Sequence, residues 1–163
     1  MRVYILIISF FLSACGFTPL YGNLDGSTST NAELQTISIR PLEGRTGQLL
    51  TNHLAEKFYT NNTTGDEKFE LIIIIEENVD RYGFNQDRST TREGYTLKTR
   101  FKLLNISSGE EVTQGLTTQN TSYDVVQSDF SNASAKQDAL ERMLLETAQR
   151  ITILLSTHFK NSE

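Results

Sequence analysis

The sequence predicts an α+β protein, a two-layer α/β sandwich in which a small mixed β-sheet carries two helices on one face. Three observations predict this class. A β-branched run over Phe69–Val79 and the strict apolar–polar alternation of Tyr95–Leu104 indicate strands, and apolar residues at helical spacing over Ser131–Phe159 indicate a long helix. Helices that each bury one stripe pack naturally on one face of a sheet, which gives the order β-α-β-β-β-α.

The composition indicates one globular domain. The chain has 163 residues, of which 37% are hydrophobic, and a formal net charge of −5. An acidic chain lacks the basic character typical of nucleic-acid binders, so we expect no nucleic-acid partner. The single cysteine, Cys15, excludes an intrachain disulfide framework and multi-cysteine metal sites, and we expect neither a metal nor another cofactor.

The N-terminus has the pattern of a secretory leader. Arg2 is followed by an apolar run over Val3–Leu12 and then by small residues up to Cys15. The run is too short for a transmembrane helix, which needs about 20 apolar residues. We therefore expect residues 1–14 to be a signal peptide.

Leu12-Ser13-Ala14-Cys15 resembles the lipobox of bacterial lipoproteins. The resemblance implies that Cys15 is acylated and becomes the first residue of the mature chain. In such lipoproteins an Asp after the cysteine commonly signals retention in the inner membrane. Because Gly16 stands at this position, the resemblance also favours a lipid anchor in the periplasmic leaflet of the outer membrane. Residues 15–32 then form the lipidated N-terminus and a Gly-, Ser- and Thr-rich tether.

The folded domain is predicted over residues 33–160 and begins with a strand and a helix. The strand lies within Leu34–Arg40 and ends at Pro41, which cannot donate to a β-ladder. The helix is predicted over Gln48–Tyr59, where Leu50, Leu54 and Phe58 repeat every four residues, with Thr46 as its N-cap.

Three strands follow. The run Phe69–Val79 is apolar on both faces at its centre, so it is an interior strand or one whose second face also meets an apolar group. The strand Tyr95–Leu104 has one core face and one wet face, and Ser107–Gly109 turns the chain into a hairpin strand over Glu111–Tyr123. The final helix is predicted to bury a wide stripe formed by Ala139, Leu140, Met143, Leu144, Ala148, Ile151, Leu154, Leu155 and Phe159.

No catalytic constellation is visible in the sequence. His53 and His158 have no partner at metal-binding or nucleophile-activating spacing, and no glycine-rich phosphate loop occurs. The Glu76-Glu77 and Glu110-Glu111 pairs could supply an acid and a base, but solvated strand ends and turns explain them better. We therefore expect a protein that is not an enzyme.

Basic residues are concentrated between positions 81 and 102. This segment contains six basic and two acidic residues, so its local net charge is +4. The basic residues are Arg81, Arg88, Arg92, Lys98, Arg100 and Lys102, and the acidic residues are Asp87 and Glu93. Lys98, Arg100 and Lys102 share one strand face about 7 Å apart, a spacing that suits lipid-headgroup phosphates. The alternative is a solvated strand face that happens to be basic.

With these elements in place, the chain resembles the LPS-assembly lipoprotein LptE family. The residues that carry the resemblance are Leu12–Phe17, Pro19–Gly22, Arg45 and Leu49, Ser122-Tyr123, and Ala139 and Ala148 of the final helix. The resemblance implies an outer-membrane lipoprotein that binds lipopolysaccharide and acts as plug and assembly partner of the β-barrel LptD. The six basic residues above are the candidate lipopolysaccharide contacts on physical grounds.

Two other functions remain open. The first is an auxiliary lipoprotein subunit of an envelope ABC-type phospholipid transport system, which would also combine a lipobox with a small α/β domain. The second, a lipid-anchored hydrolase, lacks a nucleophile and a base in this sequence. Co-purification with a large barrel or with inner-membrane ATPase components separates the first alternative from the LptE-like function.

Overall fold

The computed structural model describes residues 32–59, 66–84 and 90–162. Its elements are β1 (Ile37–Ile39), α3 (Gly44–Phe58), β2 (Phe69–Phe84), β3 (Thr90–Asn105), β4 (Glu111–Asp124) and α4 (Asp129–Ser162). The predicted α+β class and element order are confirmed. The predicted signal peptide and nearly all of the predicted tether lie outside the described residues.

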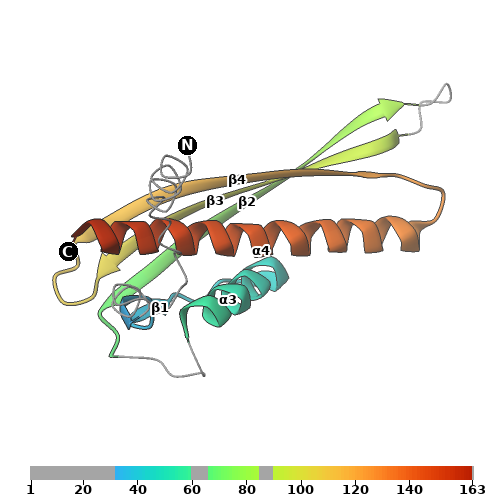
Figure 1. Ribbon diagram of the computed structural model, residues 1–163. Helices are drawn as coiled ribbons and strands as arrows, with labels where there is room; N and C mark the ends of the chain where they lie inside the picture. Colours follow the sequence, from blue (N-terminus) through green and yellow to red (C-terminus); the bar gives the residue numbers. More distant parts are fainter. Residues whose placement is uncertain (1–31, 60–65, 85–89, 163) are drawn as a thin grey trace, which may run out of the picture.

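The four strands form one mixed sheet in the order β1-β2-β3-β4 (Figure 1). β2, β3 and β4 follow one another as an antiparallel meander, whereas β1 pairs parallel to β2 over only three residues, Phe69–Leu71. β2 is therefore interior only at its start. Its two-sided apolar centre lies beyond β1, where Ile74 is 57% exposed, so the predicted interior position is not observed there.

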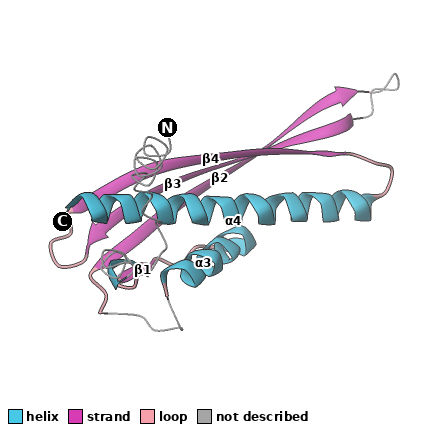
Figure 2. Cartoon of the chain, in the orientation of Figure 1, coloured by secondary structure: helices cyan, strands magenta, loops and turns pink. Residues whose placement is uncertain are grey.

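Both helices lie on the same face of the sheet, which gives two layers (Figure 2). α4 runs along β4 and β3, and α3 packs beside α4. The core between the layers includes Leu50 and Leu54 of α3, Leu71 of β2 and Leu97 of β3, all fully buried. The predicted stripe of α4 is confirmed for seven residues that are all buried, Ala139, Met143, Leu144, Ala148, Ile151, Leu155 and Phe159. The other two predicted members, Leu140 and Leu154, are only partly buried and pack against this core.

The first strand and helix differ in detail from the prediction. Leu34 is buried, but it lies in a helical turn ahead of β1, where Thr36 donates its N–H to the Glu33 carbonyl at 3.0 Å. α3 begins at Gly44 with Glu43 as its N-cap, so the predicted cap at Thr46 is wrong. The loop before α3 approaches the helix closely, since a Cβ on Gly47 would lie 2.6 Å from the Leu42 Cβ.

β2 and β3 are each longer than predicted. Their pairing continues through polar residues to Tyr82 and Arg92, beyond the point where the apolar pattern stops. The hairpin end that β2 and β3 share projects away from the helices (Figure 1). Strand length here is set by backbone pairing with the neighbouring strand, which hydrophobic periodicity does not report.

Tyrosine–carboxylate contacts lie on the helix side of this region. Tyr95 donates its hydroxyl to Glu77, and Tyr123 donates to Glu93. Burial, followed by the hydrogen bond to Glu93, raises the pKa of Tyr123 to about 12. The Tyr123 hydroxyl and then Arg81 lower the pKa of Glu93, because both hydrogen-bond its charged form.

Candidate functional site

The sheet face opposite the helices carries the candidate site, and we call it the open face. It is formed by even-numbered residues of β2, β3 and β4, because side chains alternate along a strand. The predicted division of β3 is confirmed: Tyr95, Leu97, Thr99, Phe101 and Leu103 are buried, whereas Lys98, Arg100 and Lys102 are exposed.

Strand register arranges the open face in rows. Arg100 on β3 lies between Ile74 on β2 and Leu116 on β4, and the next row is Ile72, Lys102 and Gln114. Ile74 and Leu116 are each 57% exposed. Arg100 therefore has an apolar neighbour on each side and Lys102 has one, so this part of the face combines positive charge with exposed hydrocarbon.

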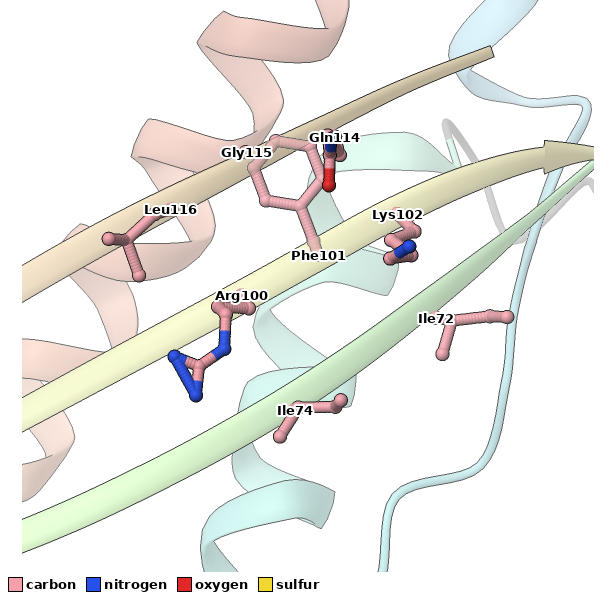
Figure 3. Close-up of a pocket in the computed structure, with 8 residues that line it drawn as sticks. All are labelled: Ile72, Ile74, Arg100, Phe101, Lys102, Gln114, Gly115 and Leu116. Carbon is pink, nitrogen blue, oxygen red and sulfur yellow. The ribbon is translucent and has the colours of Figure 1, made fainter. Parts of the chain in front are cut away.

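These rows line a shallow hollow of about 380 Å³ (Figure 3). Ile72, Ile74, Arg100, Lys102 and Leu116 surround it, together with Gln114, Phe101 and Gly115. Phe101 belongs to the buried side, and its ring occupies the place of a side chain on Gly115: a Cβ there would lie 2.5 Å from the Phe101 Cζ.

Neighbouring strands bring carboxylates to most of the cations. Arg100 pairs with Glu76, Lys102 Nζ lies 2.8 Å from a Glu111 oxygen, and Arg92 Nε lies 3.3 Å from Asp124. Among the residues that the structure describes, no carboxylate lies within 4.0 Å of Lys98. Among the described residues of this segment, the positive charge is therefore largely balanced in space.

These ion pairs are exposed, and exposed pairs contribute about 0–1 kcal/mol each. Arg100 and Glu76 are 53% and 52% exposed in their side chains. A multiply charged anion can therefore replace a carboxylate partner at little cost in stability. Arginine can bind phosphate through two parallel hydrogen bonds, whereas lysine acts as a point charge.

The structure does not bring all six predicted basic residues together. Lys98, Arg100, Lys102 and Arg92 share the open face, but Arg81 lies on the helix side, where its Nε is 3.0 Å from Glu93. Arg88 and the predicted lipidation site Cys15 lie outside the described residues. The sequence reasoning did not select Ile72, Ile74 and Leu116, although the two-sided apolar run of β2 signalled the first two.

The described parts of the chain contain no cluster of three or more His, Cys, Asp or Glu side chains that could hold a metal ion. His53 lies between α3 and α4, and within the described ranges neither of its ring nitrogens has a hydrogen-bond partner. None of the described helices is long and apolar enough to cross a membrane.

The fold of this domain is shared with bacterial lipoproteins of solved structure. The chain is similar to a structure described as that of a lipoprotein from Caulobacter crescentus, with 23% identity and a TM-score of 0.69 over 85% of this chain and 100% of that one. It is also similar to rare lipoprotein B from Shewanella oneidensis, with 10% identity and a TM-score of 0.57 over 78% and 97% of the two chains. At these identities the likeness shows a shared fold.

The family model for LptE, lipopolysaccharide-assembly, matches residues 34–155. The chain therefore belongs to the LptE family of lipopolysaccharide-assembly proteins, a non-enzymatic family. A search of curated proteins found no match.

Proposed function

We propose that this protein is an outer-membrane lipoprotein that binds lipopolysaccharide on its open face. The observation that carries the proposal is the row Ile74–Arg100–Leu116, in a chain whose family acts in lipopolysaccharide assembly. Lipopolysaccharide combines phosphate groups with fatty acyl chains. The open face offers a partner for each, because its cations and exposed hydrocarbon lie side by side.

Each part of the face has a distinct role in the proposed complex. Arg100 and Lys102 exchange their carboxylate partners for phosphate oxygens, and Lys98 contributes a further charge. Charge-assisted hydrogen bonds of this kind are roughly twice as strong as neutral ones. Ile74 and Leu116 cover hydrocarbon next to the phosphate, which removes apolar surface from water and favours an acylated ligand over free phosphate.

The proposal extends to the anchor and the protein partner. Acylation of Cys15 would hold the domain at the periplasmic side of the outer membrane, since several acyl chains give stable anchoring. The partner is the β-barrel LptD, which the domain would plug and help to assemble. Family membership over residues 34–155 supports both statements.

A charge-reversal experiment tests lipopolysaccharide binding. Reversing Lys98, Arg100 and Lys102 to Glu together should weaken binding of purified lipopolysaccharide by more than about tenfold, since each charge-assisted bond contributes about 1.5–3 kcal/mol. Added salt should weaken binding by the parent protein, because salt screens exposed charges. The same substitutions to Gln give a milder variant that does not place three new acids beside Glu76 and Glu111.

The matched control reverses three exposed cations of α4, Arg142, Arg150 and Lys160, which changes the net charge equally on the other side of the molecule. Circular dichroism and urea melts confirm that both variants fold. Equal binding by the open-face variant and the parent would rule out this face as the binding site.

Co-purification from detergent-solubilised outer membranes tests the protein partner. A stable complex with a very large β-barrel is the expected result. Recovery with inner-membrane ATPase components instead would overturn the proposal and favour the phospholipid transport function.

A further inference from the structure

β4 forms one edge of the sheet over its whole length. It pairs with β3 on one side, and in the described parts of the chain no strand pairs with its other side. Alternate residues of an antiparallel edge strand direct their N–H and C=O groups away from the sheet. β4 therefore presents a row of backbone donors and acceptors over 14 residues.

Natural proteins usually protect a long edge with charged side chains, proline or a short strand. β4 uses none of these along its central part, because all twelve residues from Val112 to Tyr123 are uncharged and none is proline. Four of the twelve are threonine, which favours extended backbone. An edge of this kind pairs readily with another strand.

β2 provides the internal comparison. β1 covers only its first three residues, so the rest of β2 also lies at an edge of the described sheet. That stretch carries Glu76, Glu77, Asp80 and Arg81, charges that oppose pairing with a further strand. The two edges of the same sheet thus differ in protection, and the unprotected one is β4.

We propose that the edge of β4 is a docking site for an extended strand of another polypeptide, which adds to the sheet as a fifth strand. Backbone hydrogen bonds supply most of the recognition in this mode, and side chains at alternate positions supply the specificity. The proposal goes beyond the proposed function, because it needs neither lipopolysaccharide nor a particular protein partner.

The charges at the ends of β4 define the chemistry of the incoming strand. Glu110 and Glu111 lie at its start and Asp124 at its end. In an antiparallel pair of two copies of this chain, Glu110 and Glu111 of one β4 would meet Asp124 of the other at both ends. Lys102 and Arg92, which pair with Glu111 and Asp124, would leave three carboxylates against two cations at each end, which is destabilising. The occupant is therefore a different chain, with Lys or Arg near both ends of its strand.

The centre of β4 defines a second requirement. Leu116 is exposed on the open face, next to the edge. A β-branched or other apolar side chain opposite Leu116 would cover it, since cross-strand pairs stabilise sheets by about 0.2–1 kcal/mol each. The incoming strand is thus uncharged and apolar in the middle and basic at the ends.

Peptide probes and amide hydrogen exchange of the full-length chain in detergent test the proposal. The first probe is a peptide of about twelve residues of alternating Thr and Val with Lys at both ends, the length of the uncharged part of β4. Two control peptides carry Glu at the ends, or N-methyl groups on alternate backbone amides. The Lys-ended peptide should slow exchange at alternate amides of β4 by at least about tenfold, whereas the N-methylated peptide should have no effect and the Glu-ended peptide a smaller one.

A proline variant provides the matched test in the protein. Of the neighbours Thr118 and Gln119, one directs its N–H outward, and the exchange map of the free protein identifies it. Proline at that position removes an outward donor without removing a ladder bond to β3, so the fold should survive and peptide protection should be lost.

Three results would overturn the proposal. The first is that all of the peptides, or none of them, protect β4. The second is that the outward-facing amides of β4 are already protected in the monomer without peptide, because the chain then covers its own edge. The third is protection that grows with protein concentration and accompanies a dimer in sedimentation, since a second copy would then be the occupant.

Discussion

Gly115 on β4 is a position where a small substitution should have a clear structural effect. In Gly115→Ala the new Cβ would lie 2.5 Å from Cζ and 2.6 Å from Cε1 of Phe101. Carbon atoms in good contact lie about 3.5–4.0 Å apart, so the ring must move by about an ångström. Phe101 is only 2% exposed, and it packs within a close-packed core that does not readily accept the shift.

We expect Gly115→Ala to lower the free energy of unfolding by about 1–2 kcal/mol. Overpacking of a core costs about 1–3 kcal/mol, and a Gly to Ala change in a strand otherwise gains about 0.5–1 kcal/mol. Urea unfolding should show a lower midpoint with an unchanged slope, because the folded and unfolded states keep their exposed surfaces.

Gly94→Ala is the matched control, because its Cβ would lie 2.6 Å from Cε1 of Tyr82. Tyr82 is 43% exposed and its ring can move into solvent, so this variant should leave stability unchanged or raise it by up to about 1 kcal/mol. Combining Gly115→Ala with Phe101→Leu should cost less than the two single changes together, by more than about 0.5 kcal/mol. Equal losses for the two glycine variants, or strict additivity of the pair, would refute the argument from Phe101.

Three further predictions follow from burial, ionisation and the leader. Ile151 is fully buried, so Ile151→Ala should lower the free energy of unfolding by about 2–5 kcal/mol in urea melts, whereas Leu145→Ala, at a site 46% exposed, should lower it by less than about 1 kcal/mol. Similar small losses for both variants would mean that the stripe of α4 faces a partner. The pKa of Tyr123 is raised to about 12 in the folded state, so its contribution to stability is present below pH 10 and is lost as the pH rises towards 12. Tyr123→Phe should flatten the dependence of stability on pH in this range, and an unchanged dependence would contradict the raised pKa of Tyr123. Cys15→Ser should leave an uncleaved or soluble protein, and intact mass with membrane fractionation checks it; unmodified Cys15 in protein taken from the native membrane would contradict the lipoprotein assignment.

The sequence predicted the fold well where one periodicity dominated. The alternation of Tyr95–Leu104 and the stripe of α4 each state which side faces the core, and both are confirmed. The start of α3 was misplaced because Thr46 resembles a cap, whereas the helix begins where the loop at Leu42 meets Gly47, a contact between residues that local propensity does not describe.

The candidate site was less predictable, because it depends on strand register. The sequence placed Lys98, Arg100 and Lys102 on one face, but it did not show that Glu76 and Glu111 lie across from them. Leu116 belongs to the same row as Arg100 only because β4 pairs with β3 in this particular register. Arg81 separates from the other cations because one residue of offset along a strand moves a side chain to the opposite face.

The packing of α3 against α4 also constrains the order of folding. α3 buries Leu50, Leu54 and Phe58 in the same cluster as Met143 and Ile151 of α4, about ninety residues further along the chain. β1 adds only three residue pairs to β2. The meander of β2, β3 and β4 needs only short loops to close, whereas α3 must await the last helix. α3 precedes the meander in the chain but is the last of these elements to acquire its native packing, and its hydrophobic stripe stays exposed until α4 is in place.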